Sequence, residues 1–141
     1  MSESKYRSLL EQAKIARGFA HAKYSHFQVG AALLTASGKI YTGSNVESSS
    51  YGLSICAERV ALVKALSEGE SEFTAIAVIA DTKEPVSPCG ACRQLLHDYA
   101  PQAAVVLGNT AGDFRESTVA NLLPDAFDDN ALIQTKQPTN H

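Results

Sequence analysis

The chain has 141 residues, 45% of them hydrophobic and 19% charged, with a formal net charge of −3. This composition and length predict one globular domain over residues 1–141, with a loose polar tail at 134–141. Lys and Arg do not cluster, so a protein that grips a nucleic-acid backbone is excluded. Because no apolar run approaches the ~20 residues of a membrane span and no signal-peptide core opens the chain, we expect a cytoplasmic protein without a membrane partner.

The first third of the chain predicts a helix and then a hairpin. Apolar residues recur at three- and four-residue spacing through "LLEQAKIA", which indicates an amphipathic helix over residues 4–21 that ends between Gly18 and His21. In "FQVGAALLT" apolar side chains alternate, "SG" is a turn signal, and "KIYTG" returns. Residues 27–43 are therefore predicted to form an antiparallel hairpin.

The middle of the chain predicts a polar loop, a helix and a buried strand. Residues 45–54 are small and polar, and Ser54 is expected to cap a helix that stops at Gly69. The run "FTAIAVIA", residues 73–80, is continuously apolar and has the length of a strand covered on both faces.

The last third predicts one more helix, a buried strand and a short closing segment. Ser87-Pro88 is expected to open a helix that runs from Cys89 to Tyr99. "AAVVLG" reads as a strand, and "STVANLLPDAF" as a strand end followed by a short helix stopped by Pro124. The order of elements predicts an α/β sandwich, in which a mixed sheet carries helices on its faces.

Three cysteines carry the strongest chemical signal. In a chain without an export signal, thiols more often bind metal or do chemistry than form disulfides. Cys89 and Cys92 are three residues apart in the first turn of a predicted helix, and Cys56 holds the same place in the preceding helix. If the two helix starts lie side by side, three thiolates converge on one zinc ion and leave a fourth position open, as in catalytic zinc sites.

Two alternatives to this open site are weaker. None of the nearby histidines has the spacing of a fourth ligand, since His97 should point away from Cys92 and neither His21 nor His26 shows ligand spacing. A redox dithiol at "CGAC" is the other reading, and it would leave Cys56 unexplained.

A carboxylate stands beside the predicted zinc site. Glu58 follows Cys56 by two residues, and at the first turn of a helix both side chains can reach one volume beyond its end. A carboxylate there can take a proton from water and pass it to a leaving group. The pattern "CAE" followed by "PCGAC" resembles the signature of the zinc-dependent nucleoside and nucleobase deaminases, with Cys in place of His as the first ligand.

The resemblance extends well beyond the signature. "FQVGAALLTASGKIYTGSNVESSSYGLSICAER", "SPCGACRQ" and "LLPDAF" are similar to cytidine deaminase of the short homotetrameric type, and the likeness covers about residues 5–130. Gln28 departs from the family, which often has proline there. The resemblance implies a three-layer α-β-α sandwich with a mixed, roughly five-stranded sheet. It also implies one Zn²⁺ per subunit bound by Cys56, Cys89 and Cys92, with Glu58 moving protons during deamination of a cytosine ring.

The resemblance further implies which residues bind a nucleoside. Asn45 and Glu47 would hydrogen-bond the ribose, chiefly its 3′-hydroxyl, while Phe27 would pack on the base and the Ala57 N–H would contact O2. Two further aromatic residues would reach the site from neighbouring subunits of a homotetramer, namely Tyr51 and Phe127.

The predicted zinc site has a net negative charge that nearby positive groups should offset. Three thiolates and Zn²⁺ sum to −1, which makes the ion a poorer Lewis acid. Two helix N-termini offset part of this charge. Arg59 lies three residues from Cys56, and we expect its guanidinium to donate to a thiolate and supply the rest.

Three functions therefore compete. The leading one is deamination of cytidine and 2′-deoxycytidine in pyrimidine salvage. A rival is deamination of another cytosine nucleoside such as a nucleoside antibiotic, against which Asn45 and Glu47 argue. The third is a catalytically idle, zinc-stabilised binding module, which would have no use for Glu58.

Overall fold

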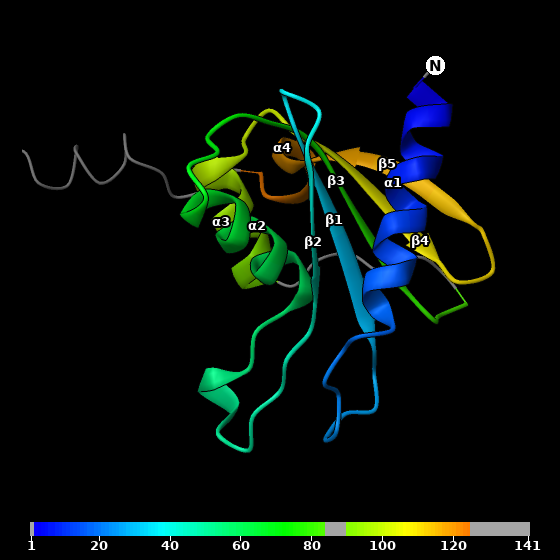
Figure 1. The fold of residues 1–141 in the computed structure, drawn as a ribbon, viewed down its shortest axis with the longest axis vertical. Helices are drawn as coiled ribbons and strands as arrows, with labels where there is room; N and C mark the ends of the chain where they lie inside the picture. Colours follow the sequence, from blue (N-terminus) through cyan, green and yellow to red (C-terminus); the bar gives the residue numbers. More distant parts are fainter. Residues whose placement is uncertain (1, 84–89, 125–141) are drawn as a thin grey trace, which may run out of the picture.

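The computed structural model describes residues 2–83 and 90–124. They form a five-stranded sheet in the order β2-β1-β3-β4-β5 (Figure 1). The strands are β1 (Val29–Thr35), β2 (Ile40–Ser44), β3 (Phe73–Ala80), β4 (Ala104–Asn109) and β5 (Phe114–Thr118). The helices are α1 (Ser2–Arg17), α2 (Ala57–Ser67), α3 (Gly90–Tyr99) and α4 (Val119–Leu122), with a 3₁₀ turn, η1, at Tyr51–Leu53.

The sheet is mixed, as predicted. β1 pairs antiparallel with β2 and β3, β4 pairs antiparallel with β5, and β3 and β4 run parallel. The hairpin predicted over residues 27–43 is confirmed, with Gly30 opposite Ser44 and Leu34 opposite Ile40. The strand predicted at 73–80 is confirmed at both ends.

Helices cover both faces of the sheet and make the three layers (Figure 1). Alternation along β1 sends Ala31 and Leu33 into a core shared with α2 and α3. Ala32 and Leu34 enter a second core under α1. Both sets are buried, which explains why β1 reads as almost continuously apolar. The α/β sandwich predicted from the sequence is confirmed.

Two glycines let the helices lie close to the hairpin, one on each face. A Cβ at Gly30 would lie 2.0 Å from the carbonyl oxygen of Ala13 in α1. A Cβ at Gly43 would lie 2.5 Å from the carbonyl oxygen of Ala57 and 2.6 Å from the nitrogen of Ala61, both in α2. Backbone meets backbone at both contacts, so a larger residue requires the helix to move.

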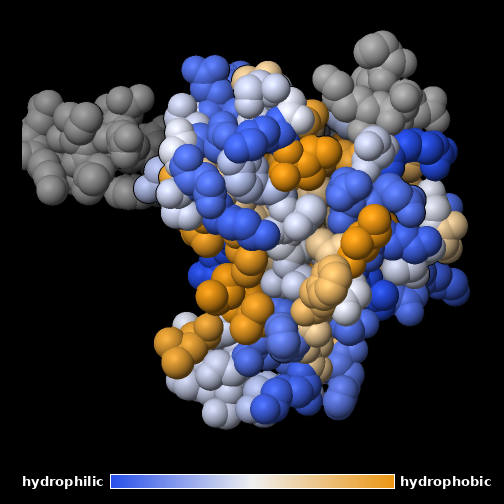
Figure 2. Space-filling view, viewed as in Figure 1, coloured by the Kyte–Doolittle hydropathy of each residue, from blue (hydrophilic) through white to orange (hydrophobic). Residues whose placement is uncertain are grey.

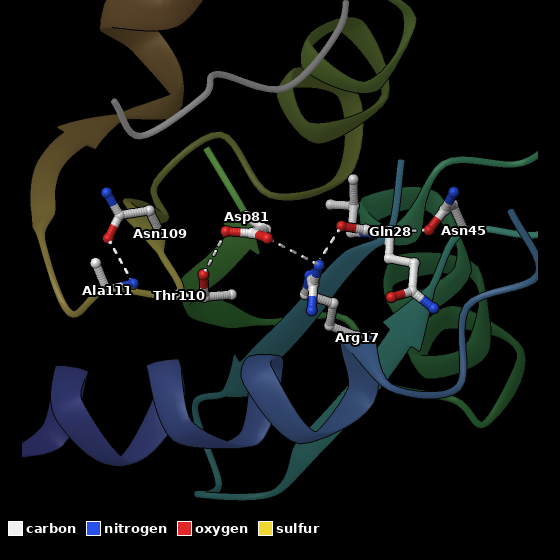
Figure 3. A network of polar contacts seen from close by, with 8 residues as sticks. Arg17, Gln28, Asn45, Asp81, Asn109, Thr110 and Ala111 are labelled. Carbon is white, nitrogen blue, oxygen red and sulfur yellow. Dashed lines mark hydrogen bonds and ion pairs between the residues drawn. The ribbon is translucent and has the colours of Figure 1, made fainter. Parts of the chain in front are cut away.

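A polar network anchors the end of α1 beside the hairpin (Figure 3). Arg17 donates from Nε to the carbonyl oxygen of Gln28 at 3.1 Å, and its guanidinium lies 4.0 Å from Asp81, just after β3. Asp81 also accepts from the Thr110 hydroxyl at 2.8 Å. The segment before β1 is thereby tied to the ends of β3 and β4.

Some predicted boundaries were wrong. α1 ends at Arg17, and residues 18–20 continue as tight turns. Ser54 does not cap α2, because its hydroxyl accepts the backbone N–H of Ser48 at 3.0 Å, and Cys56 holds the N-cap position. The stop at Gly69 is close to the observed end at Ser67, and Gly69 has the positive φ of 94° that favours glycine.

The predictions for the last third of the chain concern α3, α4 and the tail, and only some of them fall on described residues. α3 runs to Tyr99 as predicted, while its predicted opening at Ser87-Pro88 lies outside the described residues, as does the tail at 134–141. Thr118 accepts the N–H of Asn121 at 3.1 Å and opens α4, which ends two residues before Pro124.

Candidate active site

A cavity of about 360 Å³ opens where the hairpin meets the start of α2. Three short segments line most of it: the chain entering β1, the chain leaving β2, and the first residues of α2. Because β1 and β2 are antiparallel neighbours, the start of one lies beside the end of the other. The register therefore places Phe27 and Val29 next to Asn45 and Glu47.

The start of α2 lines the end of the cavity that contains the cysteine and the buried glutamate. Cys56, Ala57 and Glu58 are consecutive and all line it. Cys56 is the N-cap residue, with extended backbone (φ −72°, ψ 155°) and no hydrogen bond from its side chain to the helix N-terminus. A helix N-terminus favours the thiolate form of a cysteine placed there, since the dipole is positive at that end.

Glu58 is buried at this end, with 5% of its surface exposed. Burial raises the pKa of Glu58 to about 7, the neighbouring Cys56 adds to the rise, and its own backbone N–H and Arg59 oppose it. A carboxyl group with a pKa near 7 holds and releases a proton with similar ease at neutral pH, which suits a general acid and base. The sequence prediction that Cys56 and Glu58 reach one volume is matched by this geometry.

Arg59 lies beside this end and is half-buried. Its guanidinium donates to the carbonyl oxygen of Ser54 at 3.0 Å. Its Nε is buried and has no hydrogen-bond partner among the described residues. A buried N–H of a cationic group without a partner is costly, so the site holds a donor that an added anionic group would satisfy.

The other two predicted zinc ligands, Cys89 and Cys92, are only partly described. Cys92 is buried in the first turn of α3, and α3 contacts α2. Cys89 lies outside the described residues. Within residues 2–83 and 90–124, no three His, Cys, Asp or Glu side chains come close enough together to hold a metal ion.

The polar end of the cavity contains Asn45 and Glu47. Asn45 is buried, and its Oδ1 accepts the N–H of Val29 at 2.9 Å (Figure 3). Its Nδ2 donates to the carbonyl oxygen of Phe27 at 2.9 Å. Its amide therefore clamps the end of β2 to the start of β1. It keeps one further N–H and one further lone pair.

Glu47 is bound to the loop that precedes β1. Its Oε1 accepts the backbone N–H groups of Tyr24 and Ser25, each at 3.0 Å, and its Oε2 accepts the Ser25 hydroxyl. These hydrogen bonds, chiefly those from Ser25, hold the pKa of Glu47 below its usual range. Glu47 is therefore ionised at neutral pH and acts as an acceptor only.

The aromatic residues have different outcomes. Phe27 lines the cavity and is 41% exposed, so it forms a wall and not part of the core. Tyr51 opens η1, and its side chain is outside the described set, as is Phe127. The sequence missed five lining residues, Ser25, Val29, Ser54, Ile55 and Val78. Ser25 could have been predicted to line the cavity, because it lies two residues before Phe27. Val78 could not, because the sequence shows it only as part of a buried strand.

The described histidines, His21, His26 and His97, do not line the cavity. His21 and His26 are exposed and border a separate hollow beside the loop that precedes β1. That neither histidine is a metal ligand stays a prediction.

Comparison with known proteins decides the family. Residues 3–108 match the model of the family described as "Cytidine and deoxycytidylate deaminase zinc-binding region". The chain belongs to this family.

Individual relatives agree with that assignment. The cytidine deaminase of Halalkalibacterium halodurans is 55% identical over 120 residues, 84% of this chain and 91% of the relative. That of Sporosarcina psychrophila is 52% identical over 84% of this chain and 88% of the relative. The crystal structure of cytidine deaminase from Burkholderia pseudomallei superposes with a TM-score of 0.82 at 51% identity, and the match covers 86% of this chain and 98% of that one.

Zinc is the cofactor of this family, and the described residues fit it. Cysteine thiolates are preferred zinc ligands. Cys56 lines the cavity from a helix N-terminus, and the buried Nε of Arg59 has no partner among the described residues and could donate to a thiolate of such a centre.

Proposed function

We propose that the protein hydrolyses cytidine and 2′-deoxycytidine to uridine and 2′-deoxyuridine and releases ammonia. One observation carries the proposal: a single cavity has a buried carboxyl group with a pKa near 7 beside a cysteine at one end, and an amide and an ionised carboxylate at the other. The first end suits proton transfer and the second suits a sugar. The cytidine deaminases at 51–55% identity support the same substrate.

Cys56, Cys89 and Cys92 would hold one Zn²⁺ per subunit. When bound, zinc activates water at neutral pH and acts as a Lewis acid. Three protein ligands would leave one coordination position for the substrate side of the cavity, where Glu58 lies.

Glu58 would move the protons of the reaction. It accepts a proton as water adds to C4 of the cytosine ring and delivers one to N3. It then takes a second proton, from the new hydroxyl on C4, and supplies it to the exocyclic nitrogen, so that the C4–N bond breaks, ammonia leaves and C4 becomes a carbonyl carbon. Burial makes this exchange efficient because it brings the pKa of Glu58 close to the working pH.

The opposite end would bind the nucleoside. The remaining N–H of Asn45 and the remaining acceptor of Glu47 would contact a ribose hydroxyl, chiefly the 3′-hydroxyl. Phe27 would pack on the base, and the backbone N–H of Ala57, at the start of α2, would contact O2. A site that pairs buried polar groups with a hydroxyl rejects ligands that lack it.

Arg59 would support the metal site. Its Nε is the buried donor without a partner among the described residues, and a zinc-bound thiolate is the acceptor that would satisfy it. This would offset the negative charge of a three-thiolate centre.

Assembly into a homotetramer would complete the site. Figure 2 shows apolar atoms exposed over η1 and the chain that leads from it to α2, and Val46, Leu53 and Ile55 are 41%, 69% and 40% exposed there. Such a patch beside a cavity is typical of an interface. A second copy would cover it and bring Tyr51 and Phe127 to neighbouring sites.

We infer a role in pyrimidine salvage in the cytoplasm. Within the described parts of the chain, no helix combines the length and apolar character needed to cross a bilayer.

A spectrophotometric assay tests the function directly. Purified protein should convert cytidine and 2′-deoxycytidine to the uracil nucleosides, lose this activity with a zinc chelator and regain it with added Zn²⁺. Zinc-loaded protein that leaves both nucleosides unchanged would overturn the proposal. Conversion of a nucleoside antibiotic in place of cytidine would favour the rival function.

A further inference from the structure

One serine hydroxyl links the two parts of the cavity that we assign to the sugar and the base. The Oγ of Ser25 donates to Oε2 of Glu47 and accepts the backbone N–H of Phe27 at 3.0 Å. The backbone N–H of Ser25 donates to Oε1 of the same carboxylate. Ser25, Phe27 and Glu47 all line the cavity.

The loop that carries Ser25 is shaped for this contact. Its base is tied to the chain after β2, because His21 exchanges two backbone hydrogen bonds with that segment: His21 N donates to the Asn45 oxygen at 2.8 Å, and Glu47 N donates to the His21 oxygen at 3.0 Å. Its far end turns at His26, which has a φ of 59°, uncommon for a residue other than glycine. His26 N also donates to the oxygen of Ala22 at 2.8 Å, which closes the turn.

The hydrogen bonds to Glu47 leave it little choice of partner. An ionised carboxylate offers about four acceptor positions. The N–H groups of Tyr24 and Ser25 and the hydroxyl of Ser25 occupy three of them. The Asn45 side chain faces the same carboxylate and also lowers its pKa. The fourth acceptor position is therefore the one that a ligand hydroxyl would take, beside the Asn45 amide.

We propose that Ser25 is a positioning residue that sets sugar recognition: its hydroxyl holds Glu47 with one open acceptor position for the 3′-hydroxyl. The inference rests on the proposed function, since it assumes a nucleoside in the cavity. The lowered pKa of Glu47, to which the Ser25 hydroxyl contributes most, agrees with this role because it keeps the carboxylate an acceptor. Ser25 itself does not contact the reacting atoms.

The test compares Ser25→Ala with Ser25→Thr and with Ser67→Ala, a control that removes an exposed serine hydroxyl bonded to the Lys64 oxygen at the end of α2. KM and kcat are measured for cytidine, 2′-deoxycytidine and 3′-deoxycytidine. Ser25→Ala should raise KM about tenfold for the two substrates that carry a 3′-hydroxyl, and change KM for 3′-deoxycytidine by less than about twofold. Ser25→Thr should restore KM, and Ser67→Ala should match the unmodified protein.

A double variant checks that Ser25 acts through Glu47. Ser25→Ala combined with Glu47→Gln should raise KM no more than Glu47→Gln does alone, because the two residues form one unit. The KM of Ser25→Ala should also begin to rise at a higher pH on the acid side, as its Glu47 loses stabilising hydrogen bonds. Should Ser25→Ala fail to fold, Ser25→Cys, which keeps the size and weakens the donor, takes its place with an intermediate rise in KM.

Several results would overturn the inference. The first is an equal rise in KM for all three nucleosides in Ser25→Ala. The second is a KM in the double variant that corresponds to the sum of the two single effects on binding free energy. The third is an unchanged KM for cytidine in Ser25→Ala. These outcomes are separate from failure of the proposed function, in which the unmodified zinc-loaded protein does not deaminate cytidine at all.

Discussion

Two glutamates at opposite ends of one cavity have pKa values shifted in opposite directions. Glu58 is buried, and loss of water raises its pKa to about 7. Glu47 lies towards solvent, and hydrogen bonds from Ser25 and Tyr24 lower its pKa. The same side chain is thus prepared to exchange a proton in one place and to remain a fixed acceptor in the other. The difference comes from burial, which dominates at Glu58, and from hydrogen-bond donors, which dominate at Glu47.

Removing the proton carrier should have the largest effect. Glu58→Gln keeps the shape of the buried end and abolishes its titration, so kcat for cytidine should fall by about 10²–10⁴-fold while KM changes little. Steady-state assays of the zinc-loaded variant measure this, with zinc content as the control. A kcat within tenfold of that of the unmodified protein would contradict the assignment of proton transfer to Glu58.

The buried carboxyl should also make the metal-free protein sensitive to pH. Above pH 4.5 an unfolded Glu58 releases its proton, whereas the folded protein holds it until about pH 7. Stability should therefore be full below pH 4.5, fall as the pH rises to about 7, and then level off, a loss of about 3 kcal/mol.

Urea unfolding of the chelator-treated protein between pH 4.5 and 7.5 measures this loss. Glu58→Gln is the control, since it lacks the titrating group. Unfolding free energies that run parallel in the two proteins would show that Glu58 keeps its ordinary pKa.

The buried end depends on how closely α2 approaches β2. Gly43→Ala would place a methyl group 2.5 Å from the Ala57 oxygen and force the start of α2 outward. We expect a loss of about 1–3 kcal/mol in unfolding free energy together with a lower kcat, because Cys56 and Glu58 move with the helix. Gly52→Ala is the matched control, since its Cβ would meet nothing within 4 Å. Equal stabilities of the two variants would contradict the close contact.

The sugar end should give the smallest effect. Glu47→Gln replaces one acceptor oxygen with a donor that clashes electrostatically with the N–H groups around it, so KM for cytidine should rise about tenfold with kcat nearly unchanged. KM for 3′-deoxycytidine should hardly move. A fall in kcat equal to that of Glu58→Gln would erase the distinction between the two ends.

The sequence went far towards the fold because its signals are local. The strand at 73–80, the hairpin and the stop near Gly69 follow from hydrophobic alternation, turn residues and glycine, each within a few neighbours. The expected Ser54 cap was wrong for a tertiary reason. Its hydroxyl accepts the Ser48 N–H, and the cap position passes to Cys56. Propensity cannot show which of two partners a serine takes.

The site divides in the same way. "CAE" and "PCGAC" in the sequence predict that the three cysteines bind a metal ion and that Glu58 transfers protons, and the family match supports zinc. The roles of all these site residues stay predictions, and two of the residues, Cys89 and Phe127, lie outside the described set as well.

The sequence alone determined which chemical groups are present and which helix begins with them. Only the tertiary structure decided that Glu58 is stripped of water and that Ser25 and Tyr24 surround Glu47. The donors to Glu47 lie 23 and 22 positions away in the chain, and the antiparallel pairing of β1 with β2 brings them alongside. A pKa is a property of that assembled environment, and no local pattern encodes it.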